Sequence, residues 1–448
     1  MATTDLLQDL GTELTRRREE LLRLDGYFSD GYVDALDVPT RARPELAKII
    51  RSGVTNWIKL TVETTAERLI VDGFRRSTET STDSTVWEWW QANRLDGRQM
   101  AHNVETLKSG YSYVGVWSGD DGAPPVIRPE SPWSLHVAYD GEDPDVATSA
   151  VKMARTGRAY LYLPDVVTVN EWNSLARRWD VVDMFENPLA EIPFVKFRAN
   201  PKVDGGTSSD LDVAIPIQDR ITRTTIERLI AAYFSAFRQR WATGLVLDVD
   251  EDGNPLAPFN AAADRLWISD EEGTKFGEFG EATLSNYISA VEADVQHLAA
   301  VTRTPPHYLL GSMVNLSAEA LKAAETGLSR KVAERQQTFG ESWEEVIRLA
   351  GKAAGDETVA ADSKIETVWK NTESTSEAQI VDAAMKLVAL DIPKEVLWER
   401  IGASPTEITR WRRMATGDAL RASLSAPKSD PGSADPDEEE ETVEELGA

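Results

Sequence analysis

The sequence predicts an α+β protein in which long amphipathic helices flank a central antiparallel β region. Its 448 residues correspond to about three structural units at ~150 residues per domain. Apolar residues recur at helical spacing over several long stretches on both sides of residues 111–197. Inside that span the period shortens, and short β-rich runs alternate with Gly, Pro, Asp and Asn, which is typical of an antiparallel sheet.

Composition excludes several classes of protein. Hydrophobic residues make up 41% of the chain and include 14 Trp, which is too many for a disordered protein. The chain has no cysteine, which excludes disulfides, thiolate nucleophiles, Fe–S clusters and zinc sites with sulfur ligands. No apolar run reaches about 18 residues and the N-terminus is polar, so we expect neither a membrane partner nor a secretory signal.

The charge balance argues against a protein that grips nucleic acid over a broad surface. Acids outnumber bases by 75 to 48, which gives a net charge of −27, whereas phosphate neutralisation needs clustered Lys and Arg. The last 21 residues hold nine acids against one lysine and predict a disordered acidic tail, but the rest of the chain is also acidic. We therefore expect any nucleic acid to be passed along rather than held.

Three helical stretches are predicted before the β region. Leucines at helical spacing mark residues 1–24, and a second apolar stripe covers residues 54–69. A turn signal at residues 71–73 ends that second stretch. Residues 86–110 carry a further stripe and predict one continuous helix.

The β region is predicted to contain eight short strands. They are separated by about 8–12 residues with turn-forming residues between them, as in an antiparallel sheet. They comprise residues 111–116, 126–127, 133–139, 150–154, 158–163, 166–172, 179–185 and 194–197.

The second half of the chain is dominated by long helices. One is predicted over residues 214–241, and a small β-containing insert follows it. Residues 283–303 form a coiled-coil-like seam, with apolar positions four and three residues apart in turn, and the prolines at 305 and 306 end it. A third long helix, capped by Ser317, extends to about residue 354, and shorter helices follow within residues 377–424.

Motifs that carry chemistry are missing. The four histidines are scattered, and the sequence has no phosphate-binding P-loop, no GxSxG nucleophile elbow and no GxGxxG turn after a strand. The acidic run at residues 248–254 superficially resembles a calcium loop, but it lacks the EF-hand spacing and is better interpreted as a hairpin turn. The sequence therefore predicts no catalytic residue, no metal site and no cofactor, and we expect a protein that is not an enzyme.

The tryptophans admit a carbohydrate-binding or base-stacking role. Most of them lie in apolar helical stripes, however, including Trp57, Trp90, Trp241 and Trp343. The sequence therefore favours packing in the core or between subunits.

Several segments, in a fixed order, resemble the portal proteins of tailed double-stranded-DNA bacteriophages. The likeness is to the siphophage type found among actinobacterial phages and prophages, and it covers roughly residues 27–350. The segments that carry it are TAERL (65–69), VDGFR (71–75), GYSYV (110–114), PESP (129–132), PIQD (216–219), QRWATG (239–244), TPPHYLLG (304–311) and SAEAL (317–321), with Ala324-Glu325, Leu328, Lys331 and residues 336–340 after them.

The resemblance implies a phage portal fold. Such a fold has a mixed α/β wing, two long stem helices flanking a small β-containing clip, a helical crown and here a disordered acidic C-terminal tail. The implied boundaries are 1–212 for the N-terminal arm and wing, 213–242 for the first stem helix, 243–282 for the clip, 283–303 for the second stem helix, 304–316 for the tunnel-loop region, 317–370 for the wing return helix, 371–427 for the crown and 428–448 for the tail.

The resemblance also implies a function. Twelve copies would form a ring at one capsid vertex, with a channel through which double-stranded DNA is packaged and ejected without sequence-specific binding. The implied partners are the terminase large subunit, bound transiently, a head–tail adaptor, and the major capsid and scaffolding proteins. The expected location is the virion, with assembly in the host cytoplasm. Two alternatives remain: another oligomeric virion or acidic scaffold protein without a DNA channel, and a metal-dependent hydrolase built from the acidic turns.

Candidate site residues follow from these implied roles. Because a basic lining would trap DNA, the channel is expected to present acidic or small polar side chains. The tunnel-loop candidates are Ser312, Met313, Val314 and Asn315, and the stem candidates are Asn286, Ser289 and Glu292, with Gln296 beside them. The clip candidates that would face terminase or the adaptor are Asp248, Asp250, Glu251, Asp252, Asp270, Glu271 and Glu272.

The first stem helix also carries a strip of arginines. Either these face neighbouring subunits and pair with acids there, or they form a solvated helix face. The strip comprises Arg220, Arg223, Arg228, Arg238 and Arg240.

Overall fold

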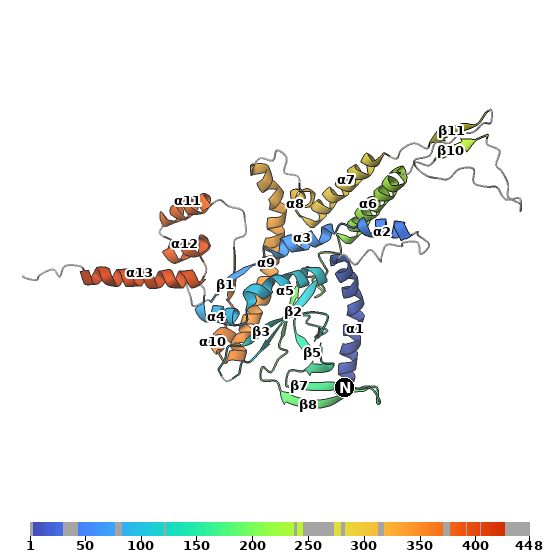
Figure 1. Cartoon of the computed structure of the whole chain (residues 1–448). Coiled ribbons are helices and arrows are strands. Elements are labelled where there is room, and N and C mark those ends of the chain that lie inside the picture. Colours follow the sequence, from blue (N-terminus) through green and yellow to red (C-terminus); the bar gives the residue numbers. More distant parts are fainter. Residues whose placement is uncertain are drawn as a thin grey trace, which may run out of the picture. The chain divides into compact units, whose positions relative to one another are not determined.

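The computed structural model describes most of the chain, in two units that are treated separately below (Figure 1). The units are Met1–Thr375 and Ser376–Ala448. Among the described residues, no helix has both the length and the apolar character needed to span a membrane. The described residues are 3–29, 44–76, 83–120, 122–236, 240–244, 273–278, 283–311, 318–370, 377–390, 392–403 and 405–425.

Three helices precede the first strand. α1 (Thr3–Phe28) and α3 (Trp57–Ala66) confirm the first two predicted helices, whereas α2 (Pro44–Ser52) has no counterpart in the sequence-based prediction. The predicted turn at residues 71–73 is wrong. These residues begin strand β1 (Val71–Arg75), because a distant segment of the chain, β12 (described below), supplies an antiparallel partner for it.

The prediction of one helix over residues 86–110 is also wrong. The structure has two helices, α4 (Ser84–Ala92) and α5 (Leu95–Ser109), separated by Asn93 and Arg94. Arg94 adopts a left-handed conformation with φ of 54°. The Asn93 side chain donates to the Pro125 carbonyl (2.8 Å) and accepts from the N–H of Ile127 (2.9 Å). Hydrogen bonds to the start of a strand therefore hold this break open.

The β region forms two antiparallel sheets, which confirms the predicted strands. One sheet has three strands in the order β3-β2-β9 and the other has five in the order β4-β5-β6-β7-β8. The strands are β2 (Tyr111–Trp117), β3 (Val126–Glu130), β4 (Leu135–Tyr139), β5 (Ala147–Met153), β6 (Arg158–Tyr162), β7 (Val166–Asn173), β8 (Arg178–Glu186) and β9 (Phe194–Arg198).

The two sheets and the helices pack in layers, because alternate residues of each strand face opposite sides. Leu7 and Leu10 of α1 pack on one face of the five-stranded sheet, against Leu161 and its neighbours. The opposite face packs on the three-stranded sheet through a separate cluster that includes Tyr113 and Phe194.

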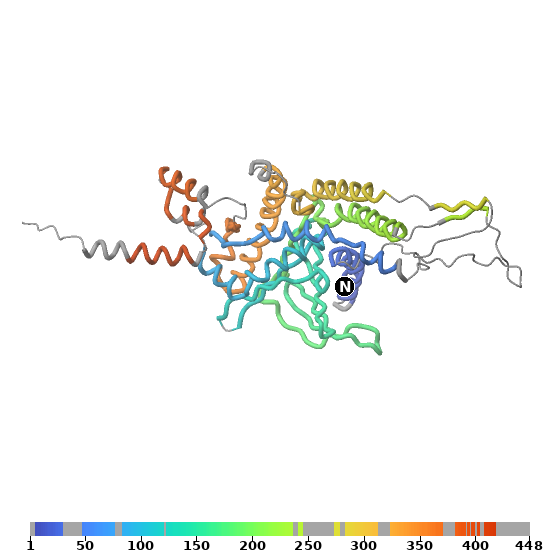
Figure 2. The backbone as a smooth tube through the Cα atoms, turned by 45° about the horizontal axis from the view of Figure 1, so that its top comes forward, coloured from blue at the N-terminus to red at the C-terminus, as the bar shows by residue number. Residues whose placement is uncertain are grey.

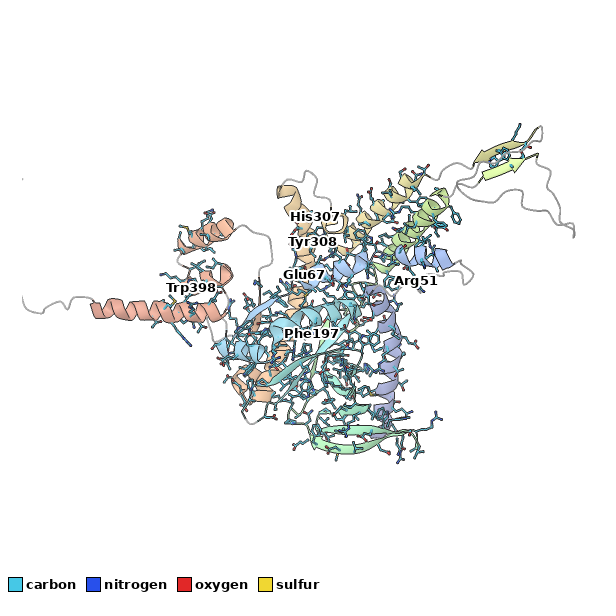
Figure 3. All side chains as sticks on the ribbon, in the orientation of Figure 1. Arg51, Glu67, Phe197, His307, Tyr308 and Trp398 are labelled. Carbon is cyan, nitrogen blue, oxygen red and sulfur yellow. The ribbon has the colours of Figure 1, made fainter. Side chains whose placement is uncertain are left out.

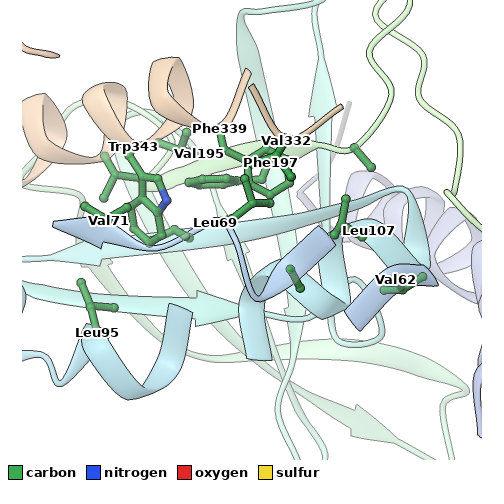
Figure 4. Packing of buried hydrophobic residues seen from close by; sticks show 14 of the residues in the cluster. Val62, Leu69, Val71, Leu95, Leu107, Val195, Phe197, Val332, Phe339 and Trp343 are labelled. Carbon is green, nitrogen blue, oxygen red and sulfur yellow. The ribbon is translucent and has the colours of Figure 1, made fainter. Parts of the chain in front are cut away.

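The largest apolar cluster lies beyond the three-stranded sheet. Trp343, from the long helix α9 (Ala318–Ala354), is 1% exposed and is packed edge-on against Trp90 (4.9 Å between ring centroids) and Phe197 (4.8 Å). Figure 4 shows Trp343 and Phe197 side by side in this cluster. The tryptophans at positions 90 and 343 therefore pack in the core, as their apolar stripes predict.

Two long helices follow the β region. They are α6 (Ile215–Ala236) and α7 (Leu284–Thr302), which run side by side in Figure 2. The predicted helix over 214–241 is too long, because Arg240–Thr243 is a strand, β10, that pairs with β11 (Lys275–Glu278). The predicted seam and stop of the second helix are confirmed, since Arg303 ends α7 with φ of 55°.

The chain then returns to pack against the core. α8 (Pro306–Leu310) is a short helix that begins at the second of the two prolines, and α9 extends for 37 residues to Ala354, as the sequence predicts. Ser317, the predicted cap of α9, lies outside the described residues. α10 (Glu357–Ala360) and β12 (Glu366–Trp369) complete this unit.

The described residues of the second unit form three helices, as predicted. They are α11 (Glu377–Val388), α12 (Lys394–Arg400) and α13 (Pro405–Ser425). Trp398 and Trp411 meet edge-on, with ring centroids 5.6 Å apart, which joins α12 to α13. The predicted disordered tail, residues 428–448, lies outside the described residues.

Candidate functional site

The pair α6–α7 is held together by packing at one end and by an ion pair along its side. Ile221 of α6 and Val295 and Leu298 of α7 are buried. Arg220 binds both oxygens of Asp294, Nε to Oδ2 at 2.9 Å and Nη2 to Oδ1 at 2.7 Å. A bidentate arginine–carboxylate pair fixes orientation as well as distance, so it sets the register between the two helices.

This ion pair settles the contact of one residue of the arginine strip, for which pairing between subunits and a solvated helix face were both expected. Arg220 pairs with an acid of its own chain, whereas Arg223 is exposed and Arg228 is half-buried. Arg240 lies in strand β10 and not in the helix. Arg238 lies outside the described residues.

The predicted stem candidates share one exposed face of α7. Asn286, Ser289 and Glu292 are exposed, as is Gln296, and they recur every three or four residues. The opposite side of α7 carries the buried residues Val295, Leu298 and Thr302. The exposed side of α7 is mostly polar or acidic and carries His297 but no Lys or Arg, and its place in a channel stays a prediction.

The β10–β11 hairpin lies at the far end of the two helices. Trp241 pairs across the hairpin with Gly277, and a Cβ on Gly277 would lie 2.4 Å from the indole. Only glycine therefore lets this ring cross the opposite strand. Trp241 is 38% exposed, so of the two predicted alternatives it does not pack in the core of its own chain, and packing between subunits stays a prediction.

All of the clip candidates and all of the tunnel-loop candidates lie outside the described residues. For the clip these are Asp248, Asp250, Glu251, Asp252, Asp270, Glu271 and Glu272, and for the tunnel loop Ser312, Met313, Val314 and Asn315. The structure does describe both flanks of the tunnel-loop segment, α8 and the start of α9.

A polar cluster, which we call the outer anchor, ties these two flanks to the turn after α3 and consists of Arg68, Tyr308 and Glu325. Arg68 Nη2 donates to Tyr308 Oη (2.9 Å) and to Glu325 Oε2 (3.0 Å), and Tyr308 Oη donates to Glu325 Oε1 (3.1 Å). The Arg68 and Glu325 side chains are 13% and 17% exposed. Figure 3 labels Tyr308 beside His307 at this position. The outer anchor therefore brings together segments that the tunnel-loop residues separate.

A second cluster, the inner anchor, lies less than three turns further along α9 and consists of Asn200, Asp210, Lys331 and Arg335. Lys331 Nζ is 2.8 Å from Asp210 Oδ2, and Arg335 Nη2 is 3.1 Å from Asp210 Oδ1. Lys331 also donates to the carbonyl of Thr302 at the end of α7 (3.4 Å). The inner anchor therefore fixes the approach to α6 and the end of α7 to the same helix.

Electrostatics hold the buried acid of the inner anchor in its charged form. Burial alone would raise the pKa of Asp210, but the charges of Lys331 and Arg335 outweigh it and lower that pKa below its ordinary value. A cavity of about 220 Å³ opens beside the cluster. Nowhere in the described part of the chain do three or more His, Asp or Glu side chains gather in a way that could hold a metal ion.

The sequence-based site predictions did not include either anchor. Contacts between residues this far apart leave no local pattern in the sequence. Arg68, Tyr308, Glu325 and Lys331 nevertheless fall within the segments that resemble portal proteins, and that was the available signal.

Comparison with known families decides the identity. Residues 11–419 match the sequence model of the family described as "Phage portal protein, SPP1 Gp6-like". The chain belongs to this portal protein family. It is therefore a structural virion protein, a head–tail connector for DNA packaging, and not an enzyme.

Individual portal proteins are similar over most of their length. The portal protein of Mycobacterium phage D29 is 29% identical over 440 residues, which cover 89% of this chain and 86% of that protein. The portal protein of Mycobacterium phage L5 is 29% identical over 410 residues, which cover 84% and 83%.

Solved structures also resemble this portal chain. The neck of a native gene transfer agent particle, computed with C12 symmetry, aligns with a TM-score of 0.45 and 13% identity over 82% of this chain and 95% of the other. The virion of a native gene transfer agent particle aligns with a TM-score of 0.44 and 14% identity over 82% and 92%.

Proposed function

We propose that twelve copies of this portal protein form a closed ring whose bore is lined by α7 and the tunnel loop. In this arrangement α6 and α7 are the stem, residues 243–282 the clip, residues 1–212 the wing and residues 371–427 the crown. The observation that carries the proposal is the polar, exposed face of α7, which α6 supports from behind through Arg220 and Asp294.

The charge of that face suits a sliding duplex. DNA presents about one negative charge per 1.7 Å of helix axis, so a basic lining would hold it at discrete positions. Asn286, Ser289 and Glu292 offer no cation to phosphate. Twelve chains, each with a net charge of −27, surround the duplex with a repulsive field that keeps contacts short-lived.

The two anchors would position the tunnel loop within the ring. The outer anchor fixes both flanks of residues 312–317 to the turn after α3, and the inner anchor fixes the end of α7 to α9. The loop candidates Ser312 to Asn315 would then project from a stable base into the bore. The clip acids would remain free to face terminase during filling and the adaptor afterwards, while the wing meets capsid and scaffolding proteins.

Native mass spectrometry and imaging along the symmetry axis test the ring. The expected mass is twelve times that of the 49.6 kDa chain, with a central hole. A stable monomer at micromolar concentration under several salt conditions would contradict the ring. An oligomer without a hole would favour an acidic scaffold protein instead.

Charge reversal tests the channel. Glu292→Lys places a ring of lysines on α7, and because each phosphate contact adds to salt-dependent binding, we expect the ring to retain DNA at low salt and to package it more slowly. The matched control is Glu142→Lys, at an exposed position in the β4–β5 turn. Identical DNA retention and packaging by the two variants would remove α7 from the bore.

A further inference from the structure

The five-stranded sheet ends in an unprotected strand. Among the strands of the described residues, β8 pairs with β7 alone, and Figure 1 shows it at the outer border of the sheet. Apolar side chains on β8 are about half exposed or more: Val181 48%, Val182 50%, Met184 64% and Phe185 49%. Contiguous exposed apolar residues on a sheet edge mark a surface that normally has a partner.

Cross-strand pairing shows that both faces of β8 are open. Phe185 lies opposite Val167, which belongs to the cluster between the two sheets, and Met184 lies opposite Thr168. Adjacent residues of a strand point to opposite faces, so Met184 lies on the α1 side of the sheet. Among the described residues, the side chains of β8 are more exposed than those of its neighbour β7, whose central residues are buried.

The outer edge of β8 has a main-chain donor that binds a side chain and not another strand. The N–H of Met184 donates to the carboxylate of the preceding residue, Asp183 Oδ1, at 2.8 Å. The Asp183 side chain therefore supplies the hydrogen-bond acceptor that a neighbouring strand would supply in the interior of a sheet. Of the devices that usually block edge pairing, residues 178–186 contain neither proline nor lysine. They do contain a register shift between the pairs Val169–Asp183 and Asn170–Val181, so the partner strand has to follow this irregularity.

The partner is not matched by the strand edges of a second copy. β8 has nine residues, whereas β10 and β11 have four each and the edge strands β3, β4 and β9 of the two larger sheets have five each. A β8–β8 contact would oppose the acids Asp180, Asp183 and Glu186 to one another, and such a two-fold contact cannot close a ring. Charge complementarity instead requires a basic partner.

We propose that β8 is a docking strand for an extended segment of another virion protein, which adds to the sheet as a sixth strand. That segment carries apolar residues on both faces, to cover Val181 and Met184 on one side and Phe185 on the other, and Lys or Arg to meet Asp183 and Glu186. Main-chain hydrogen bonds supply the pairing, and the side chains supply the selectivity. The inference rests on the proposed function only in requiring that the portal is incorporated into particles.

Thiol labelling tests the docking strand, because the chain has no cysteine of its own. Met184→Cys places a single thiol on β8, and Leu175→Cys, at a position 97% exposed in the β7–β8 turn, is the control. In the purified portal we expect both thiols to be alkylated at similar rates. In assembled particles the thiol at 184 should react at least about tenfold more slowly, since a paired strand must open before it reacts.

Two results would overturn the inference. Protection at position 184 in the purified ring would mean that a second copy covers β8, and equal labelling of both positions in particles would mean that nothing covers it. If native mass spectrometry finds no ring at all, the proposed function fails. A ring that enters particles with an unprotected thiol at 184 refutes the docking strand alone.

A proline substitution tests whether main-chain pairing provides the protection. Met184→Pro removes the outward N–H while leaving β7 paired, because proline is tolerated on edge strands, and Met184→Ala is the matched control. With Val181→Cys as the reporter, we expect the alanine variant to stay protected in particles and the proline variant to lose that protection. Equal protection in both variants would contradict strand addition.

Discussion

Asp210 is the residue whose loss should most disturb the base of the stem. Its side chain is 5% exposed and contacts Lys331 (2.8 Å), Arg335 (3.1 Å) and Asn200 (2.8 Å). Asp210→Asn keeps the shape but leaves two buried cations without their acid. Removing one partner of a buried ion pair costs about 3–5 kcal/mol, so we expect the free energy of unfolding to fall by that amount.

Thermal and urea unfolding of the purified portal measure this loss. With an entropy of unfolding of about 2 cal/mol/K per residue, a loss of about 4 kcal/mol in the unit Met1–Thr375 lowers its midpoint by about 5 °C. Asp212→Asn is the control, because the Asp212 side chain is 35% exposed in its pair with Arg23 and should lose no more than about 1 kcal/mol.

The effect should also depend on pH. The pKa of Asp210 is lowered in the folded protein, so its contribution is complete above the unfolded value and is lost as pH falls through the folded one. The difference between wild type and Asp210→Asn should therefore be full at neutral pH and shrink below about pH 4. A variant within about 1 kcal/mol of wild type at pH 7 would refute the assignment of Asp210 as the charge that holds the inner anchor.

Three further predictions concern separate parts of the first unit. Glu325→Gln weakens the outer anchor around Arg68, and hydrogen exchange of residues 306–311 should accelerate about tenfold, since a charged hydrogen bond contributes about 1.5–3 kcal/mol; unchanged exchange would exclude a positioning role. Arg94→Asn should raise the free energy of unfolding by about 0.5–1 kcal/mol, because asparagine tolerates the left-handed conformation at φ of 54°, and a loss of stability would contradict this. Burial, with a smaller effect of Arg198, lowers the pKa of Lys196 to about 8, so the unfolded chain binds more protons from about pH 8 to 10. In urea titrations, the free energy of unfolding of wild type should therefore rise by about 2 kcal/mol relative to that of Lys196→Met across that range. A difference that stays constant with pH would refute this prediction.

Local patterns predicted most of the fold. The alternation of four- and three-residue intervals in residues 284–302 defines one face of a helix, and α7 begins and ends where that pattern does. Turn residues between short β-rich runs likewise predicted the strands β2 to β9. These elements depend on neighbours in the sequence, which is why the sequence alone indicates them.

Features that depend on distant partners were missed or wrong. Val71 becomes a strand residue because Trp369 pairs with it, and the helix over residues 86–110 breaks because Asn93 binds β3. The site shows the same division: exposed positions on α7 follow from helical periodicity, whereas the two cations that pair with Asp210, Lys331 and Arg335, lie more than 100 residues away in sequence. No local signal encodes such pairings.

The two anchors on α9 differ in their mechanical stiffness. Both are held by charge, and Coulomb attraction weakens gradually with separation. The charged groups of each cluster can therefore be pulled further apart before their attraction is lost than the partners of a short hydrogen bond. The cluster around Glu325 is partly exposed, whereas the one around Asp210 is buried, so we expect the second to be the stiffer of the two. A pulling force on the chain between α8 and α9 is thus expected to disrupt first the cluster around Glu325 and then the cluster around Asp210, before the apolar core bears any load.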